Sequence, residues 1–254
     1  MKFGVDLYKD KVAVVVGSTS GIGAAICKAF AEQGAKVVVS GRRQERGDQV
    51  VNTIKEQGGE AIFFRVDATN PEELKNLIDG TVKKFGKIDI LVNSVAVEMA
   101  VLMADATLED YTKIMDTNLR SYFLATMYAL PYMRKQKNGN ILNINSITSV
   151  QFAPGVGIYS MAKAAIRNMT KAIAFELAQE GIRCNDLNPG LIHAAVYETP
   201  EGARHGALGV AATPARRMGT PEECAYAALY LCCDEIAAFT TGAALFVDGG
   251  KTLG

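Results

Sequence analysis

The sequence has no excess of charge of either sign. Its 27 Lys and Arg residues balance 27 Asp and Glu residues, so the formal net charge at pH 7 is zero. Without a basic surplus there is no electrostatic attraction for nucleic acid or for an anionic membrane surface. We therefore expect a small-molecule substrate, and neither a nucleic-acid partner nor a membrane partner.

The sequence also lacks the segments that would send it out of the cell or into a bilayer. The opening "MKFGVDLYKD" has no continuous apolar core of the signal-peptide kind. Apolar stretches such as "VAVVV" at 12–16 are far shorter than the roughly 20 residues of a spanning helix. The five cysteines form neither a C-x-x-C pair nor an even-numbered framework. We expect a soluble protein of the reducing cytoplasm, with no bound metal.

What the chain does have is a regular alternation of short β-branched runs and longer segments with helical spacing of apolar residues. The short runs are typical of fully buried strands. Their alternation with helices predicts an α/β fold, a doubly wound parallel sheet of about seven strands with helices on both faces. At 254 residues we expect a single domain, 1–254. The expected strands are 11–16, 36–40, 61–66, 88–93, 140–145, 182–187 and 243–248.

Two helix starts and one long loop are predicted from local signals. Asn70-Pro71 and Thr220-Pro221 each combine an N-cap residue with proline at the first helical position. Residues 188–220 contain three prolines, five glycines and both histidines, and we expect this region to be irregular. A loop of that length in a compact domain is more often functional than a plain connector. We predict a substrate loop at about 188–220.

The first expected strand runs directly into a glycine-rich turn, "VGSTSGIGAAICKAF". Glycines spaced G-x-x-x-G-x-G between a strand and a helix permit a tight turn and close backbone approach, and the free amides of the new helix favour a pyrophosphate. Glycines also serve turns that bind nothing, but the strand-turn-helix context favours a dinucleotide site. The candidate contacts are Gly17, Ser18, Thr19, Ser20, Gly21, Ile22 and Gly23.

The end of the second expected strand indicates which dinucleotide the protein binds. An acid about 20 residues beyond the glycines would bind the 2′-hydroxyl of the adenosine ribose. Here Gly41 stands at that place and is followed by Arg42 and Arg43, whose guanidinium groups suit a 2′-phosphate. The alternative is two solvated arginines at a helix start, where positive charge is mildly unfavourable. We predict that NADP(H) is favoured over NAD(H).

A second constellation lies in "GVGIYSMAKAAI" at 155–166. Tyr159 and Lys163 are four positions apart, which places them on one face of a helix. Alone, this spacing favours a packed tyrosine and a lysine that extends to water. Ser146 lies 13 residues before Tyr159, at the end of an expected strand.

Taken together, these motifs resemble the short-chain dehydrogenase/reductase family over essentially the full chain. The matching residues, in chain order, are Gly17-x-x-x-Gly21-x-Gly23, Asp67, Asn93, Asn118, Ser146, Tyr159-x-x-x-Lys163 and Asn188-Pro189-Gly190. The resemblance implies a Rossmann-like dinucleotide-binding and catalytic domain. It also implies a homotetramer built through long helices at about 108–135 and 157–180.

The resemblance further implies catalytic roles. Tyr159 would exchange a proton with the substrate oxygen, Ser146 would donate a hydrogen bond to it, and Asn118 would hold a water that links Lys163 to solvent. Bringing a tyrosine pKa from about 10 to neutrality needs about 4 kcal/mol. A lysine ammonium about 5 Å away supplies roughly 3 kcal/mol at an effective dielectric constant near 20. The positive charge of the oxidised nicotinamide would supply the remainder, so Lys163 would lower the pKa of Tyr159 together with the cofactor and would bind the nicotinamide ribose.

The remaining cofactor contacts are likewise implied by the resemblance. Asp67 and Ala68 would border the adenine, and Asn93 would border the adenosine-side ribose. Pro189, Gly190 and Ile192 would lie against the nicotinamide.

The chain departs from the family pattern at two places near the nicotinamide. Ser94-Val95-Ala96 replaces Asn-Ala-Gly, which puts bulkier side chains on the floor of the cofactor site. Ala194 stands where a threonine commonly holds the carboxamide, and the neighbouring His193 is a candidate substitute. Because Ser146, Tyr159 and Lys163 remain, we expect activity with altered cofactor anchoring.

The predicted function is oxidoreduction between a secondary alcohol and a ketone by hydride transfer. A 3-oxoacyl thioester and a hydroxysteroid are both candidate substrates, and loop composition does not separate them. One alternative is an enoyl reductase, which the Tyr159-to-Lys163 spacing disfavours. The other is a cofactor-binding regulator with weakened catalysis, which the intact catalytic set disfavours.

Overall fold

The computed structural model describes residues 6–253, and its centre is a seven-stranded sheet. All neighbouring strands run parallel in the order β3-β2-β1-β4-β5-β6-β7. The strands are β1 Val12–Val16, β2 Lys36–Gly41, β3 Glu60–Arg65, β4 Ile90–Asn93, β5 Gly139–Ile144, β6 Ile182–Pro189 and β7 Ala244–Val247. Each lies at a predicted run, so the predicted parallel sheet is confirmed.

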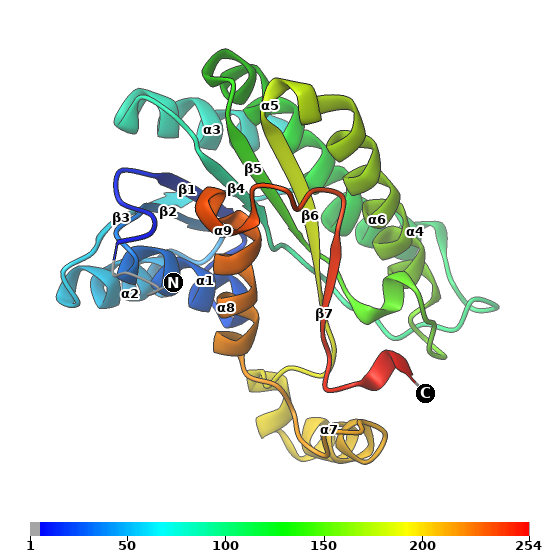
Figure 1. Cartoon of the computed structure of the whole chain (residues 1–254). Coiled ribbons are helices and arrows are strands. Elements are labelled where there is room, and N and C mark those ends of the chain that lie inside the picture. The colour runs from blue at the N-terminus through cyan, green and yellow to red at the C-terminus, as the bar shows by residue number, and fades with distance from the viewer. Residues whose placement is uncertain (1–5, 254) are drawn as a thin grey trace.

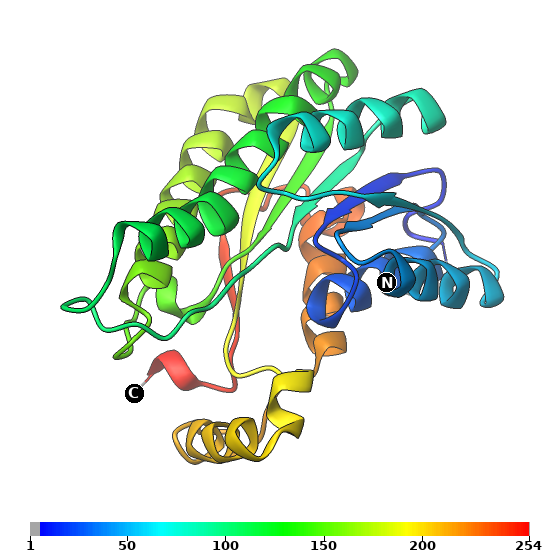
Figure 2. The ribbon, with the colours of Figure 1, turned by 180° about the vertical axis from the view of Figure 1, so that it is seen from behind.

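Helices cover both faces of this sheet (Figures 1 and 2). They are α1 Gly21–Glu32, α2 Gln44–Glu56, α3 Pro71–Phe85, α4 Leu108–Met115, α5 Ser121–Gln136, α6 Gly157–Leu177, α7 Pro200–Ala211, α8 Pro221–Cys232 and α9 Asp234–Ala237. Strand β1 shows why helices must cover both faces of the sheet. Ala13 and Val15 pack into the core with α1 and α8, whereas Val14 and Val16 pack into the core with α3 and α5, because successive side chains of a strand point to opposite faces.

The order of the strands places a crevice at the carboxyl edge of the sheet. From β1 the chain continues to β2 and β3 on one side, and β4 to β7 lie on the other. The loop after β1 leads toward β2 on one side, and the loop after β4 leads toward β5 on the other side. A crevice forms between two such loops, and open α/β sheets bind their ligands there. The glycine turn after β1 and the loop after β4 therefore face each other across the crevice.

Both predicted helix starts are confirmed. The Asn70 side chain accepts hydrogen bonds from the amides of Glu72 and Glu73 at the start of α3. Thr220 and Glu223 form a reciprocal capping box at the start of α8. These ends are determined by neighbouring residues, so the sequence alone was sufficient to find them.

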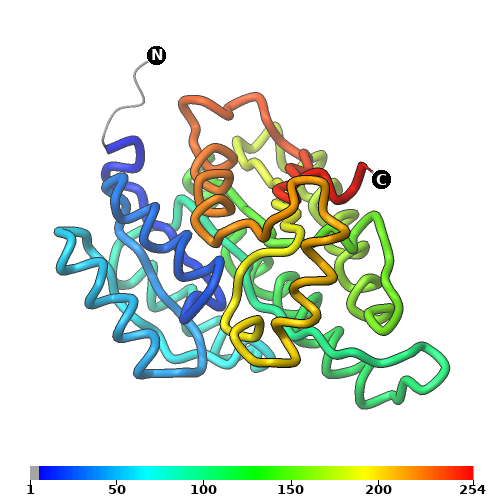
Figure 3. The backbone as a smooth tube through the Cα atoms, turned by 90° about the horizontal axis from the view of Figure 1, so that it is seen from below, coloured from blue at the N-terminus to red at the C-terminus, as the bar shows by residue number. Residues whose placement is uncertain are grey.

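The prediction that 188–220 is irregular is wrong. The segment contains a short turn at Ala195–Glu198 and the helix α7, whose first turn is capped by Thr199. Its glycines concealed the helix, but they serve close packing: a Cβ at Gly202 would collide with the carbonyl of Val196. Figure 3, which views the molecule from the carboxyl edge of the sheet, shows the segment (yellow to orange) crossing in front of that edge.

The first of the two predicted long helices is interrupted. Between α4 and α5 the chain forms a π-helical turn, η1, at Asp116–Arg120. The second, α6, ends at Leu177 and continues as a short turn to Glu180, as predicted. A π-turn of this kind often marks a functional site in a helix, and here it contains Asn118.

Two properties of residues 6–253 bear on the kind of partner. Within this range no helix combines the length and the apolar character that crossing a membrane requires. The same residues contain no group of three or more His, Cys, Asp or Glu side chains arranged to hold a metal ion.

Candidate active site

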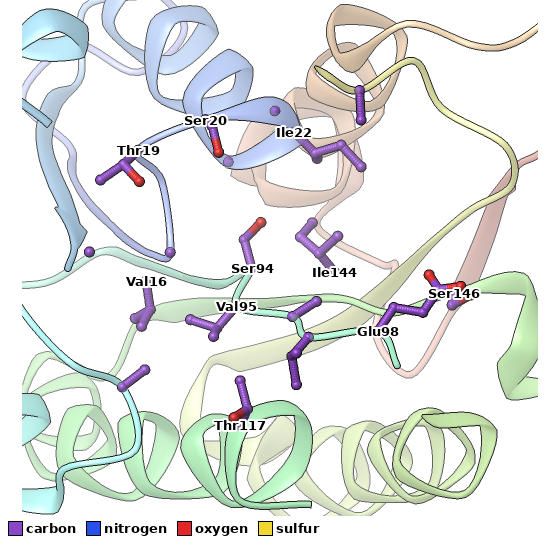
Figure 4. Close-up of a pocket in the computed structure, with 18 of the residues that line it drawn as sticks. Val16, Thr19, Ser20, Ile22, Ser94, Val95, Glu98, Thr117, Ile144 and Ser146 are labelled. Atoms are coloured by element: carbon purple, nitrogen blue, oxygen red, sulfur yellow. The ribbon is translucent and has the colours of Figure 1, made fainter. Parts of the chain in front are cut away.

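A cavity of about 890 Å³ opens at the carboxyl edge of the sheet. It extends from the glycine turn after β1 to the start of α6, and Figure 4 shows part of its lining. The predicted site residues that line it are Gly17, Thr19, Ser20, Gly21, Ile22, Gly23, Arg42, Arg43, Asp67, Ala68, Ser146, Tyr159, Lys163, Pro189, Gly190 and Ile192. Residues far apart in the sequence thus meet around one space long enough to hold an extended ligand.

The glycine turn forms a cradle that side chains would fill. Gly17 has φ of +82°, and a Cβ there would lie 2.7 Å from Val95 Cγ2. A Cβ on Gly23 would lie 2.5 Å from the carbonyl oxygen of Gly17. Ser20, at the N-cap of α1, makes no side-chain capping bond, so the first amides of the helix stay available to an anion. The turn therefore fits the pyrophosphate of a dinucleotide.

The end of β2 is crowded at Gly41. A Cβ there would lie 2.7 Å from Thr19 Cγ2, so an aspartate could enter only if the Thr19 side chain moved. Arg43 reaches back across this space, where its Nη2 donates to Thr19 Oγ1 at 3.0 Å and to Ser20 Oγ at 2.9 Å. The usual partner of an unphosphorylated ribose is thus replaced by a guanidinium group.

Positive charge accumulates at this end of the cavity. Burial and the neighbouring charges of Arg46 and Arg42 lower the pKa of Arg43. Within residues 6–253 no carboxylate forms an ion pair with any of these three arginines. Arg46 was not predicted; it lies one helical turn beyond Arg42 but does not line the cavity. Asp67 lines the same end and lies within electrostatic reach of Arg42, but among the described residues no ion pair occupies these guanidinium groups, which suit a phosphate.

The other end of the cavity holds Ser146, Tyr159 and Lys163. Ser146 follows β5, and its hydroxyl accepts a hydrogen bond from the amide of Thr148 at 3.1 Å. Lys163 is only 1% exposed, and its Nζ lies 5.5 Å from the centre of the Tyr159 ring. It donates to the carbonyl oxygen of Ile144 at 2.9 Å. The alternative of a lysine that extends to water is therefore wrong.

Burial dominates the protonation equilibria of this group. Burial raises the pKa of Tyr159, Glu98 raises it further, and the Ser146 hydroxyl lowers it only in part. Burial also lowers the pKa of Lys163 to about 7, against the opposing effect of Asp186 and Glu98. Among the protein's own groups desolvation is thus the largest effect. The predicted fall of the Tyr159 pKa, to which the charge of the oxidised nicotinamide contributes, stays a prediction.

Two residues predicted to contact the cofactor lie outside the lining of the cavity. The Ser18 hydroxyl donates to the carbonyl of Val15 at 2.8 Å and accepts from the amide of Ser40 at 2.9 Å, which ties β1 to β2. The Asn93 amide group donates to Asn143 Oδ1 at 2.9 Å, which ties β4 to β5. Both side chains brace the strands that carry the site, and the predicted cofactor contacts of Ser18 and Asn93 stay predictions.

Asn118 supports the loop that follows β4. Its Oδ1 accepts from the amide of Val97 at 2.8 Å, and its Nδ2 donates to the carbonyl of the same residue at 2.7 Å. The side chain is fully buried in the π-turn. Asn118 is therefore a positioning residue for this loop, and its predicted role in holding a water near Lys163 stays a prediction.

Tyr122 was not predicted, yet its hydroxyl lies at the centre of the site. It is 2.8 Å from the carbonyl oxygen of Ile144, 3.0 Å from that of Val95 and 3.5 Å from Lys163 Nζ. The side chain is 1% exposed. Its only sequence signal is the spacing of four from Asn118, which places both on one helical face. Together the two side chains hold the loop after β4, and Tyr122 also supports Lys163.

Replacing Tyr122 with phenylalanine tests this positioning role. Loss of the hydroxyl leaves the Val95 carbonyl oxygen without this donor, whereas the Ile144 carbonyl keeps Lys163, so we expect the free energy of unfolding to fall by about 1–3 kcal/mol. We expect kcat to fall by roughly tenfold, while the substrate KM changes little, because Lys163 loses one partner. Thermal unfolding and steady-state kinetics measure both. Tyr128→Phe, the same change on the same helix, is the control, and equal losses in the two variants would contradict the role.

Comparison with known proteins now identifies the family. A family model described as enoyl-(acyl carrier protein) reductase matches residues 16–252. The chain is 35% identical over 244 residues to the 3-oxoacyl-[acyl-carrier-protein] reductase FabG of Thermotoga maritima, covering 96% of this chain and 98% of the relative. The chain belongs to the short-chain dehydrogenase/reductase family. The resemblance predicted from the motifs is confirmed.

Other members of the short-chain dehydrogenase/reductase family agree with this assignment. The cyclopentanol dehydrogenase of Comamonas sp. is 36% identical over 247 residues, covering 96% of this chain and 97% of its own. The crystal structure of gox2181 superposes with a TM-score of 0.92 at 29% identity, covering 98% of each chain. The protein is therefore an oxidoreductase that acts on CH–OH groups, in a family that binds a nicotinamide cofactor.

Proposed function

We propose that the protein is an NADP(H)-dependent oxidoreductase that interconverts a secondary alcohol and a ketone. The observation that carries the proposal is the single cavity that joins the glycine turn and the arginines to Ser146, Tyr159 and Lys163. The phosphate preference rests on Arg42, Arg43 and the crowding at Gly41. We also propose that the segment 188–220 forms the substrate side of the site, because Val196 and Tyr197 line the same cavity.

Each group of residues along the cavity would have its own role. The glycine turn would hold the pyrophosphate, Asp67 and Ala68 the adenine, and Lys163 the nicotinamide ribose. The bound nicotinamide supplies or accepts the hydride. Ser146 would donate a hydrogen bond to the substrate oxygen and stabilise the negative charge that develops on it. Tyr159 would transfer the proton.

The raised pKa of Tyr159 bears on the direction of the reaction. Burial keeps the phenol protonated at neutral pH. A protonated phenol can donate directly to a ketone oxygen, so this protonation state is the one from which reduction of the carbonyl starts. For oxidation of the alcohol, the phenol must first lose its proton, and the positive charge of Lys163 assists that loss.

A substrate panel tests the proposal. With NADPH we expect turnover of ketones and of an acetoacetyl thioester, and little turnover of a crotonyl thioester, which an enoyl reductase would reduce. We expect kcat/KM with NADPH to exceed that with NADH by about tenfold or more, the worth of one charged hydrogen bond. Faster reduction of the crotonyl thioester would support the enoyl reductase. NADPH binding without any turnover would support the regulator.

Three further features are proposed with this function. Residues 1–254 would form one dinucleotide-binding and catalytic domain, since one cavity holds both ends of the site. A homotetramer would cover the exposed apolar side chains of Phe123 and Met127 on α5 and of Phe175 on α6. The free thiols, buried at all five cysteines, fit a reducing cytoplasm.

A further inference from the structure

Glu98 is a charged residue in the cavity that the catalytic scheme does not use. It lies in the loop after β4, next to Val97, which Asn118 clamps from the π-turn. Its side chain lines the cavity, and Figure 4 shows it extending toward Ser146. Within residues 6–253 no Lys, Arg or His side chain forms an ion pair with it. Asn118 thus fixes the backbone next to Glu98, and among these residues the carboxylate forms no structural ion pair.

The carboxylate faces the reacting groups. Its charge raises the pKa of Tyr159, of Lys163 and of Tyr197, so it lies within electrostatic reach of all three. Glu98 is exposed to solvent, and its partial desolvation raises its own pKa while the charge of Lys163 lowers it. Glu98 therefore shares the cavity with Tyr159 and Lys163, and Tyr197 of the segment 188–220 lines it as well.

We propose that Glu98 selects a neutral substrate that carries a hydroxyl group beside the reacting carbonyl carbon, and that it accepts a hydrogen bond from that hydroxyl. This inference rests on the proposed function and names its substrate class: hydroxyketones and the corresponding vicinal diols. The reaction itself is unchanged, since hydride and proton go to the carbonyl and the neighbouring hydroxyl keeps its proton.

Three other substrate types fit less well. An apolar chain placed against Glu98 would remove water from a carboxylate and give it no hydrogen bond in return. A 2-oxo acid would bring a second negative charge beside the first. An amino ketone would bring a cation close to Glu98 but also close to Lys163. A neutral hydroxyl satisfies the carboxylate without any of these costs.

A matched pair of ketones tests the inference. In 1-hydroxy-2-butanone a hydroxyl replaces one terminal methyl group of 3-pentanone, so the two differ only in the group that would face Glu98. With NADPH we expect kcat/KM to be about 10- to 100-fold higher for the hydroxyketone, the worth of a hydrogen bond to a charged group. Glu98→Leu should reduce this ratio to about threefold or less, and Glu98→Gln should give an intermediate ratio because its amide oxygen still accepts.

Glu109→Leu is the matched control. It removes the same charge from an exposed position on α4 that does not line the cavity, and the ratio should remain that of the wild type. Melting temperatures of all variants show whether each is folded.

The outcomes separate this inference from the function on which it rests. A wild-type ratio near one, or a ratio unchanged in Glu98→Leu, would overturn the inference while leaving the ketone reductase intact. In the oxidation direction, faster turnover of 1-amino-2-butanol than of 1,2-butanediol would overturn it in favour of a cationic substrate. No turnover of any ketone or alcohol would overturn the proposed function itself.

Discussion

Replacing Tyr159 with phenylalanine is expected to lower kcat for ketone reduction by about 10²- to 10⁴-fold, the usual contribution of a positioned general acid. The aromatic ring packs in a small core with Ile114, Ile158 and Ala162, and phenylalanine keeps that packing. Only the hydroxyl is lost, so the fold and the affinity for NADPH should change little. Steady-state kinetics with saturating NADPH, together with NADPH titration of the variant, measure the two effects separately.

A tyrosine outside the cavity provides the control for this variant. Tyr111 is 42% exposed on α4 and does not line the site, so Tyr111→Phe should retain wild-type turnover. If Tyr159→Phe also retained wild-type turnover over the whole ketone panel, Tyr159 would not be the proton donor. The cofactor-binding regulator would then become the better interpretation.

Replacing Arg42 with alanine is expected to raise the dissociation constant of NADPH by about 10- to 100-fold, because a hydrogen-bonded charge pair with the 2′-phosphate is lost. The dissociation constant of NADH should change by about threefold or less, since NADH presents only hydroxyl groups at that place. Fluorescence titration of both nucleotides measures the two constants. The loss should also shrink at high salt, which screens partly exposed charges.

Arg42 provides a cleaner test than Arg43. Arg43 donates hydrogen bonds to Thr19 and Ser20, so its removal also loosens the glycine turn and should weaken NADH binding as well. Arg204→Ala, which removes an exposed charge on α7, is the control and should leave both constants unchanged. Equal weakening of NADPH and NADH by Arg42→Ala would contradict a role in recognising the 2′-phosphate.

The altered floor of the cofactor site, Ser94-Val95-Ala96, was visible in the sequence, but its consequences became visible only in the tertiary structure. The sequence indicated bulkier side chains there, and the structure shows their consequence, since Val95 packs so close to Gly17 that no Cβ fits between them. The Tyr122 hydroxyl donates a hydrogen bond to the Val95 carbonyl, and the Asn118 side chain accepts one from the amide of Val97, two residues further along the loop. Neither support could be predicted, because both bridge more than 20 positions of the chain.

The sequence by itself determined the parallel sheet, the capped starts of α3 and α8, the glycine turn and the spacing of Tyr159 and Lys163. These features depend on side-chain periodicity and on bonds between near neighbours, which a sequence displays directly. Only the tertiary structure decided that Glu98 and Tyr122 enter the site, that Asn118 clamps a loop, and that the pKa of Lys163 falls to about 7. These contacts and this pKa depend on burial and on residues that are distant in the sequence, and both come into play only when the chain has folded.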